Sequence, residues 1–471
     1  MNRGHWGSRL AFVLAAAGSA IGLGNIWKFP YITYVNGGGK FVILYLFCIL
    51  LVGLPVMLAE MILGRRTQKG PVGSVEHISG KKSGWRGMGM LGVFASFAMM
   101  TFYGVVAGWV LSYIVLSLIG RFNGMEASEF STLFSSLASS PWLNVGGSTV
   151  FLGLSLAIVL GGVKSGLEKF CNVLMPVLIG IMVCLCINSM FSESEGFSKA
   201  MKFMFSMDGE LKGHAILEAL GHAFFSLSIG MGAMLTYGSY MSKDGDLVKS
   251  AVLVAFLDTF IALMACIIIF STLLGHGVEV GQSVGLVFQT LPYEFAKASY
   301  GSLINLSFFI LLFLAALTSG ISLVEVPAAY LIDKGYTRNA ATLIIGGLIW
   351  IVSIPCALSG TPEWNAVFGG WSFFDTMDNM VSWYLMPLGG LLICLYVGFV
   401  MPDKMRKSEY FMGSSSAPIF YTVWLVLVRF VAPFIVVVIM CNKLGFITNQ
   451  QFDSYFSSML GSSKTQEPAT P

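Results

Sequence analysis

Several side chains with oxygen donors stand alone inside long apolar segments of this sequence. Asp258 lies within AFLDTFIALMA, Thr318 and Ser319 lie within FLAALTSGIS, and Asn25 and Ser226 interrupt two further apolar stretches. Polar and ionisable groups are costly in an apolar medium, so residues of this kind are candidates for function. Carboxylate, amide and hydroxyl oxygens suit a small hard cation, whose charge an ionised Asp258 would balance. For the two residues in FLAALTSGIS, a hydroxyl bonded back to its own helix is the alternative.

Two of these stretches are interrupted by glycine. AAAGSAIGLGNIWKFP (15–30) places three glycines close to Asn25, and GHAFFSLSIGMG (221–232) carries two serines between its glycines. Unpaired backbone groups are very costly in hydrocarbon, so a broken helix is tolerated there only where it lines a cavity inside the protein. The freed carbonyls and amides can then bind an ion and a charged solute. A plain helix-packing motif, Gly18-x-x-x-Gly22, is the alternative for the first stretch.

The composition indicates a membrane-embedded helical frame around these residues. Of the 471 residues, 56% are hydrophobic and 11% are charged, whereas a soluble protein carries roughly 25% charged residues. Runs of about 20 apolar residues mark membrane spans. Such runs lie at 10–34, 41–64, 88–119, 148–163, 170–191, 215–240, 248–275, 302–332, 339–359, 377–401 and 418–441. The sequence therefore predicts an all-α membrane protein with eleven transmembrane helices, of which helices 1 and 6 are broken.

Positive charge is distributed unevenly between the two sides of the predicted membrane. With the N-terminus inside, 17 of the 27 lysine and arginine residues fall in cytoplasmic segments and 8 in outer segments, while Lys28 and Arg429 lie within spans. The positive-inside rule therefore places the N-terminus in the cytoplasm and the polar tail outside.

The second broken helix comes five helices after the first. A five-helix repeat enters the membrane in opposite senses, so 1–191 (spans 1–5) and 192–401 (spans 6–10) are predicted to form an inverted pair. Span 11 occupies 402–441, and 442–471 form the polar extracytoplasmic tail. Interrupted helices at corresponding places of two halves indicate a binding site near the middle of the membrane.

Other titratable residues in the spans have less specific interpretations. His214, Glu218 and His222 recur every fourth residue on one helix face. A metal site there is conceivable, but a polar network near the outer mouth is the preferred reading, because only three ligands are present without an HExxH motif. Glu60 and Glu325 are interpreted as interhelical hydrogen-bonding groups, with a proton-linked role as the alternative.

Six segments of the chain resemble the neurotransmitter:sodium symporter family. They are AGSAIGLGNIWKFPY, NGGGKF, LAEMILGR, FFSLSIGMGAMLTYGSY, LAALTSG and FDTMD, in the family's order and over nearly the whole chain. Eleven spans, and a 120–147 loop without a cysteine pair or an Asn-x-Ser/Thr acceptor, resemble the bacterial amino-acid branch. The resemblance implies a LeuT-type fold in a bacterial inner membrane. It also implies sodium-coupled import of hydrophobic and aromatic L-amino acids, with no enzymatic activity and no nucleic-acid partner.

The same resemblance implies two sodium sites and one substrate site. Sodium site one would use Ala20, Asn25, Ser226 and Asp258, and sodium site two Gly18, Ile21, Ala315, Thr318 and Ser319. The substrate carboxylate would meet the amides of Leu23 and Gly24 and the hydroxyl of Tyr103. Its ammonium would meet the carbonyls of Ala20, Phe225 and Ser226, with Ser228 as a further candidate. The side-chain pocket would be lined by Met99, Tyr103, Phe225, Met231, Ser319 and Leu323.

Departures from the family pattern refine these expectations. Gly22 stands where monoamine-transporting members carry aspartate, so the substrate should be an α-amino acid with its own carboxylate. Methionine in the pocket adapts to different side-chain shapes. Asp258 stands where many members carry asparagine, and Ala262 stands at a serine position of the chloride-dependent members. A fixed carboxylate can replace the charge of chloride, so transport is predicted to be chloride-independent.

Gating residues are also implied by position. The outer gate would be the ion pair of Lys28 with Asp378, with Phe225 over Tyr103 as a lid. His222 matches a glutamine in other members and makes pH-sensitive gating an option. The inner latch would join Arg3 and Trp6 to Asp333 and Tyr240.

Other classes of function fit the sequence less well. A channel needs a continuous pore, whereas two broken helices around one central site favour alternating access. An amino-acid sensor needs a signalling domain, but the longest inner loop spans only 65–86. No GxSxG, HExxH or nucleotide motif occurs in a context that favours a membrane enzyme. A proton-coupled transporter stays as a variant, and the oligomeric state is left open.

Overall fold

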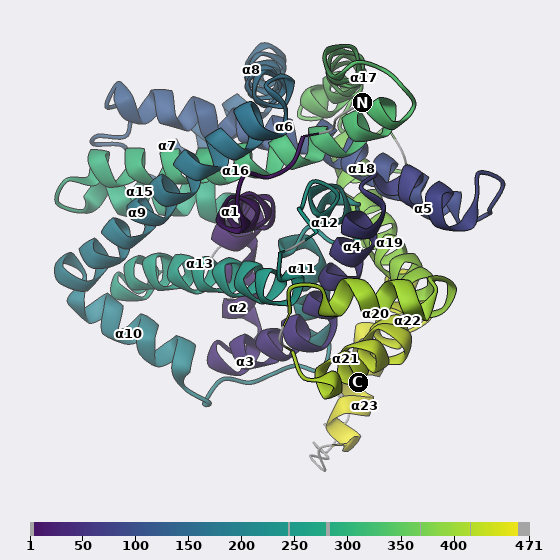
Figure 1. Ribbon diagram of the computed structural model, residues 1–471. Coiled ribbons are helices and arrows are strands. Elements are labelled where there is room, and N and C mark those ends of the chain that lie inside the picture. The colour runs from purple at the N-terminus through teal and green to yellow at the C-terminus, as the bar shows by residue number, and fades with distance from the viewer. Residues whose placement is uncertain (1–3, 244, 279–282, 368, 415, 460–471) are drawn as a thin grey trace.

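The computed structural model describes residues 4–243, 245–278, 283–367, 369–414 and 416–459, and their regular structure is helical (Figure 1). Nine helices in these ranges are long and apolar enough to cross a membrane. They are Gly39–Thr67 (α3, η2 and α4), Arg86–Leu118 (α6), Pro141–Leu160 (α8), Val163–Ser192 (η3 and α9), Leu247–Gly275 (α13), Gly301–Asp333 (α16), Arg338–Leu358 (α17), Phe373–Val400 (α18 to η6) and Pro418–Lys443 (α21 to α22).

Two further predicted spans are broken helices. The first is formed by α1 (Arg9–Ala20) and by Gly24–Val35 (η1 and α2), which are bent by 55° at the break. The second is formed by α11 (Ala215–Ser226) and α12 (Ala233–Gly238), which flank a non-helical segment. Both breaks fall where glycine interrupts the apolar pattern. Whether α11 and α12 together cross the membrane as the eleventh span stays a prediction.

The predicted fourth span, 148–163, has the wrong boundaries. α8 begins at Pro141, seven residues earlier, and ends at Leu160. Proline is well placed in the first turn of a helix, because its missing N–H needs no partner there. Asn144 and two glycines lower the hydropathy of this first part and conceal the helix start. The Asn144 amide is nevertheless satisfied, because it donates to the carbonyls of Ala138 (2.7 Å) and Ala357 (3.2 Å).

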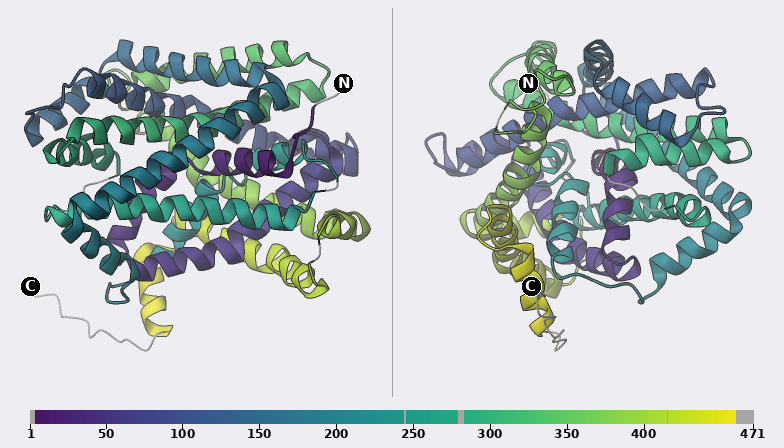
Figure 2. Two further views of the ribbon diagram at one scale, coloured as in Figure 1. Left: turned by 60° about the vertical axis from the view of Figure 1, so that its left-hand side comes forward. Right: turned by 180° about the vertical axis from the view of Figure 1, so that it is seen from behind.

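α1 lies at the centre of the helix bundle. Figure 1 shows it with α16, α13 and α12 around it, and all three make contacts with α1. α6 runs along α16 and completes the wall on the other side of the core (Figures 1 and 2). This arrangement places both breaks inside the protein, where neighbouring helices can satisfy the freed backbone groups.

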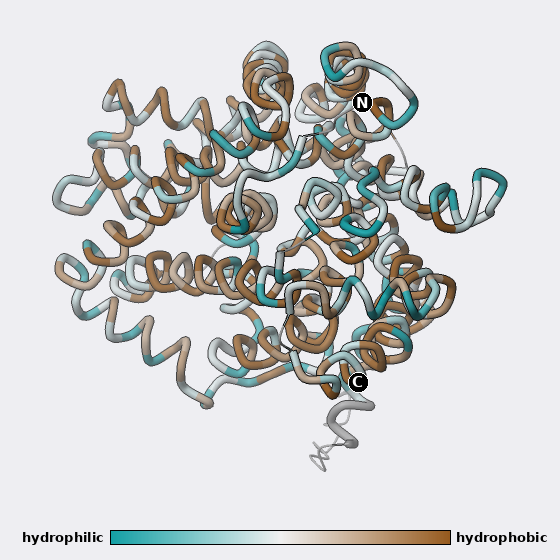
Figure 3. The backbone as a smooth tube through the Cα atoms, viewed as in Figure 1, coloured by the Kyte–Doolittle hydropathy of each residue, from teal (hydrophilic) through white to brown (hydrophobic). Residues whose placement is uncertain are grey.

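Short helices connect the long ones. They are α5 (Pro71–Ser79), α7 (Ala127–Ala138), α10 (Ser194–Phe205), α14 (Ser283–Gly285), α15 (Leu291–Lys297), α20 (Asp403–Phe411) and α23 (Asn449–Met459). α23 lies in the segment expected to be a polar tail, and its Asp453 accepts a hydrogen bond from the backbone N–H of His214 (2.8 Å). Hydropathy along the chain follows this division, since the long helices are mostly hydrophobic and the connections are more hydrophilic (Figure 3).

The bundle has two polar ends. We call the end that carries α15, His214, Lys443 and α23 the C-terminal face, and the end that carries Trp6, Arg65, Tyr240 and α20 the N-terminal face. In Figure 2 (left) the first residues of α1 (purple) and α23 (yellow) lie at opposite ends of the molecule.

Candidate functional site

The first break opens the backbone beside α16. α1 ends at Ala20 and η1 begins at Gly24, and the Ile21 amide makes the last bond of α1, to the carbonyl of Ala17 (2.7 Å). The Gly22 amide donates to Asn25 Oδ1 (3.1 Å). A Cβ on Gly22 would lie 2.9 Å from Ser319 Oγ and 3.2 Å from the Tyr103 hydroxyl. Glycine is required here because the backbone and the two side chains meet without room for a methyl group.

The second break is a turn held by a buried carboxylate. Ser228, Gly230 and Gly232 have φ values of 51°, 85° and 76°, which interrupt the helix between α11 and α12. Glu60 of α4 accepts hydrogen bonds from the amides of Gly230 (2.7 Å) and Leu235 (3.2 Å). The carboxylate thus satisfies backbone groups that the break leaves unpaired, which fits the hydrogen-bonding role predicted for Glu60.

Asn25, Ser226 and Asp258 form one buried cluster between the first break, α11 and α13. Asn25 Nδ2 donates to Asp258 Oδ1 (2.7 Å) and to Ser226 Oγ (3.1 Å). Ser226 Oγ donates to Asp258 Oδ2 (2.6 Å). All three side chains are buried, and Asp258 is fully so. Residues separated by more than 200 positions in the sequence therefore converge on one carboxylate.

The hydroxyl groups of Thr318 and Ser319 have different partners. The Thr318 hydroxyl lies 3.1 Å from the carbonyls of Leu314 and Ala315 in its own helix, which is the alternative considered from the sequence. The Ser319 hydroxyl instead faces the first break, 3.3 Å from the carbonyl of Ile21 and 3.4 Å from that of Gly18. Ser319 thus links α16 to the end of α1.

A small central cavity of about 20 Å³ lies between the two breaks. Eleven of the twelve residues predicted to bind substrate line it, namely Ala20, Gly22, Leu23, Gly24, Met99, Tyr103, Phe225, Ser228, Met231, Ser319 and Leu323. Ser226 is absent from this wall, because its hydroxyl points to Asp258. Ser19 and Asn25 also line the cavity. The sequence analysis missed Ser19, whose carbonyl accepts a hydrogen bond from Ser228 Oγ (2.7 Å), because only the fold reveals such a backbone partner.

A larger cavity of about 150 Å³ separates the central cavity from the C-terminal face. Lys28 and Asp378 both line it, but within the described residues they make no ion pair within 4.0 Å. Lys28 Nζ lies 5.0 Å over the Phe225 ring, and Asp378 Oδ1 accepts from Ser382 Oγ (2.9 Å). The predicted outer pair is thus not formed in this structure. Phe225 and Tyr103 line both cavities and stand between them.

His214, Glu218 and His222 each have a different partner. The His214 ring contacts Asp453 (2.9 Å), Glu218 accepts from Asn36 Nδ2 (2.6 Å), and the buried His222 ring stacks on Phe29 (5.3 Å between centroids). They do not converge on a common point, and no group of three potential metal ligands occurs in the described part of the chain.

Hydrogen bonds and an ion pair join several segments at the N-terminal face. Trp6 donates its indole N–H to the Tyr237 carbonyl and its amide to the Tyr240 carbonyl, both at 3.0 Å. Glu325 accepts from the Tyr240 hydroxyl and forms a bidentate ion pair with Arg338 (2.8 and 3.0 Å). The predicted contact between Trp6 and Tyr240 is therefore present.

The other two residues of the predicted inner latch are Asp333 and Arg3. Asp333 accepts a hydrogen bond from the amide of Gly70 (2.8 Å). Arg3 lies outside the described residues, so its predicted role is not examined by the structure.

A helical membrane bundle in which two broken helices converge on an enclosed cavity has the architecture of a secondary transporter. The model of the sodium:neurotransmitter symporter family matches residues 3–131 and 140–463. The chain therefore belongs to the sodium:neurotransmitter symporter family, and it is a multi-pass, sodium-dependent membrane transporter rather than an enzyme.

Individual relatives agree with this assignment. The chain is 35% identical over 450 residues to the sodium-dependent transporter YhdH of Bacillus subtilis (strain 168), covering 94% of this chain and 98% of the relative. It is 31% identical to a sodium-dependent transporter of Haemophilus influenzae, covering 93% and 98%. The crystal structure of MhsT in complex with L-phenylalanine matches with a TM-score of 0.84 and 38% identity, over 94% of this chain and 100% of MhsT. The LeuT-type fold expected from the sequence is thereby confirmed.

Proposed function

We propose that this protein is a sodium-coupled symporter that imports hydrophobic and aromatic L-α-amino acids by alternating access, with two sodium sites and no need for chloride. The observation that carries the proposal is the central cavity between the two breaks. Backbone and hydroxyl groups around Gly22 form the polar part of its lining, and Met99, Met231 and Leu323 belong to the apolar part. Such a cavity offers polar groups to a carboxylate and an ammonium, and apolar surface to a side chain.

The first sodium ion would bind at the Asp258 cluster. Asp258 supplies a full negative charge, and Asn25 and Ser226 supply neutral oxygens with the carbonyl of Ala20. In the described structure Asn25 turns its NH₂ group to Asp258, so we expect the amide to present Oδ1 instead when the ion enters. The substrate carboxylate would complete this site and thereby link binding of substrate to binding of sodium.

The second sodium ion would bind where α16 meets the end of α1. Ser319 already faces the carbonyls of Gly18 and Ile21. The Thr318 hydroxyl touches the Ala315 carbonyl (3.1 Å), so a small rotation could bring these oxygens around one ion. Because these carbonyls belong to the break, ion occupancy would depend on the position of α1.

The substrate would be held by the first break and by Phe225. A Cβ on Gly24 would lie only 2.7 Å from the Phe225 ring, so this ring is packed against the break above the cavity. The central volume of about 20 Å³ is roughly that needed by a single water. Entry of an amino acid therefore requires Phe225 and its neighbours to move outwards, as a lid does.

The proton-coupled alternative has less support. Glu60 is engaged by two backbone amides and Glu325 by Arg338 and Tyr240. Both carboxylates therefore act as hydrogen-bond acceptors that hold neighbouring segments of the scaffold together. A non-transporting sensor on the same fold is the other alternative.

The proposed membrane orientation is that of a bacterial inner-membrane protein with the N-terminal face in the cytoplasm. Residues 1–191 and 192–401 would form the two inverted repeats. Sodium would supply the driving force, since one cation crossing 100 mV contributes about 2.3 kcal/mol before its concentration gradient is counted.

Uptake of a tritiated amino-acid panel into proteoliposomes tests the proposal. The panel contains Trp, Tyr, Phe, Leu, Ala and Glu, under an inward sodium gradient in chloride or gluconate. We expect sodium-dependent accumulation of the apolar members in both anions. Binding without accumulation would identify a sensor, accumulation driven by a pH gradient without sodium would identify proton coupling, and uptake of Glu but not of Phe would refute the substrate class.

A further inference from the structure

A third cavity, of about 180 Å³, lies between α2, α11, α19 (Met386–Leu395) and α22 (Ala432–Lys443). It shares Lys28 and Phe225 with the cavity that contains Asp378. Its volume is several times the roughly 10–15 Å³ that a single water requires. It is therefore large enough for a small organic molecule.

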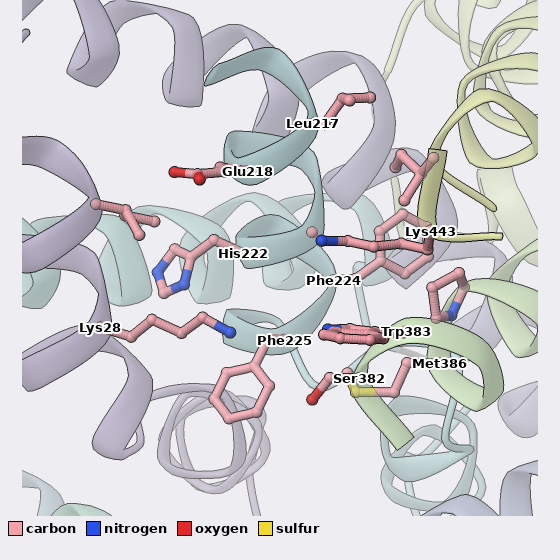
Figure 4. A pocket seen from close by; sticks show the side chains of 14 residues that line it. Lys28, Leu217, Glu218, His222, Phe224, Phe225, Ser382, Trp383, Met386 and Lys443 are labelled. Atoms are coloured by element: carbon pink, nitrogen blue, oxygen red, sulfur yellow. The ribbon is translucent and has the colours of Figure 1, made fainter. Parts of the chain in front are cut away.

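Two lysines enter this cavity without a direct ion pair to any carboxylate of the described residues. Figure 4 shows Lys28 and Lys443 reaching in from opposite sides, with their ammonium groups towards the middle. Within the described residues, neither ammonium has a carboxylate within 4.0 Å. Lys443 Nζ instead lies 5.2 Å over the Trp383 ring, as Lys28 Nζ lies 5.0 Å over Phe225. Lys443 is acted on by the positive charge of Lys28 and by the negative charge of Glu218, and an anion between the two lysines would offset the repulsion between them.

A third polar group in the wall also lacks a partner. His222 is 1% exposed, and neither of its ring nitrogens has a hydrogen-bond partner in the described structure. A buried imidazole without partners is costly, because the lost hydrogen bonds with water are not replaced. Glu218, the one carboxylate in the wall, accepts a hydrogen bond from Asn36 (2.6 Å). The cavity therefore combines two cations and one unsatisfied N–H donor with a single carboxylate that is already engaged.

The remaining wall is apolar and aromatic. Phe224, Trp383, Met386 and Ile439 cover one side of the cavity. An inorganic ion alone would leave this surface against water, whereas a carboxylate that carries an apolar group would cover it.

We propose that this cavity is a binding site for an organic carboxylate with an apolar body. The carboxylate lies between Lys28 and Lys443 and accepts a hydrogen bond from His222, and the apolar body packs on Trp383 and Met386. Lys28 also belongs to the predicted outer gate. A bound carboxylate competes with Asp378 for Lys28, so it hinders formation of the outer pair and slows closure of the C-terminal face.

Phenylacetate is a suitable probe, and phenylacetamide is its uncharged counterpart of nearly the same shape. Binding to the purified full-length protein is measured by calorimetry in sodium with saturating L-phenylalanine. The variants are Lys443→Gln, Lys443→Arg and, as a control, Lys297→Gln, a lysine of the same face that is paired with Glu294 (2.9 Å). Tryptophan fluorescence, compared with Trp383→Phe, reports whether the probe lies beside Trp383.

We expect phenylacetate to bind and phenylacetamide to bind at least about tenfold more weakly, because a charge-assisted hydrogen bond is lost. Lys443→Gln should weaken phenylacetate binding by a similar factor, Lys443→Arg by less than about threefold, and Lys297→Gln not at all. Equal binding of the two probes, or unchanged binding to Lys443→Gln, overturns the proposal. If phenylacetate binding depends on Lys443, the measured heat comes from this cavity and not from the central cavity.

A second variant covers the case in which Lys443→Gln does not fold. Ile439→Phe narrows the cavity and leaves both lysines in place. We expect it to weaken phenylacetate binding at least about tenfold by overpacking the site. Unchanged binding to this variant would likewise overturn the proposal.

Discussion

The two sides of the central cavity differ in the kind of oxygen group that they offer to an ion. On one side Asp258 places a full charge among side chains from the first break, α11 and α13. On the other side Ser319 and Thr318 of α16 face backbone carbonyls, with no formal charge. The charged side depends on one carboxylate, whereas the neutral side depends on where the end of α1 lies. We therefore expect the first side to govern ion affinity and the second to couple ion binding to movement of α1.

Loss of the charge on Asp258 should have the largest effect. Removing one partner of a buried charge pair costs roughly 3–5 kcal/mol, so Asp258→Asn should weaken sodium binding on the order of 100-fold or more. Sodium-dependent binding of L-phenylalanine, measured in gluconate and in chloride, tests this. We expect chloride to restore part of the loss in the variant only, because it can supply the missing charge.

Asp375→Asn is the matched control, since Asp375 lies at the start of α18 (Phe373–Asn379), where it accepts a hydrogen bond from Ser372 Oγ (2.6 Å). It should leave the sodium dependence unchanged. If uptake by the unmodified protein itself falls when gluconate replaces chloride, Asp258 does not take the place of chloride.

Gly22→Ala should have the second-largest effect, because the added methyl group enters the space between the two sides of the cavity. The added Cβ would lie 2.9 Å from Ser319 Oγ. Overpacking of this kind costs roughly 1–3 kcal/mol, which corresponds to about 5- to 150-fold weaker amino-acid binding. Saturation binding of L-phenylalanine at fixed sodium measures the effect.

Gly180→Ala serves as its control, because a Cβ there meets nothing within 4 Å. It should bind like the unmodified protein. Equal binding by Gly22→Ala and Gly180→Ala would mean that substrate does not approach the first break.

The neutral side is tested by exchanging a hydroxyl for a methyl group. Thr318→Val keeps the shape of the side chain and removes only the oxygen. If Thr318 is a sodium ligand, apparent sodium affinity should fall about tenfold, while Thr318→Ser should stay within about threefold. A loss in both variants would point to packing against Gly18, whose Cβ position is 3.2 Å from Thr318 Cβ. No loss in either would mean that the hydroxyl serves only its own helix.

Sequence patterns located the breaks and the clusters because their signals are local. Glycines in apolar runs marked both breaks, and isolated oxygen donors marked Asp258 and Ser319. The start of α8 was misplaced because the Asn144 partners, Ala138 and Ala357, become neighbours only in the fold. The absence of the pair between Lys28 and Asp378 was equally hidden, because both residues have alternative partners nearby. The positions of charged residues and glycines thus predict where the site lies. Which of several possible polar partners a side chain binds depends on packing and cannot be predicted in the same way.

The smallest effect is expected from Glu60→Gln. This substitution changes the hydrogen bonds that hold the second break, which lines the central cavity. The amide oxygen of glutamine can still accept the Gly230 N–H, while the longer bond from Leu235 (3.2 Å) is lost or replaced. One neutral hydrogen bond is worth roughly 0.5–1.5 kcal/mol, so sodium-driven uptake of L-phenylalanine should fall by no more than about 2- to 12-fold. Uptake under a sodium gradient is compared with uptake under a pH gradient alone. If Glu60 carried the coupled proton, the variant would lose accumulation entirely, and the carboxylate would have to be placed in the transport cycle rather than in the scaffold of the break.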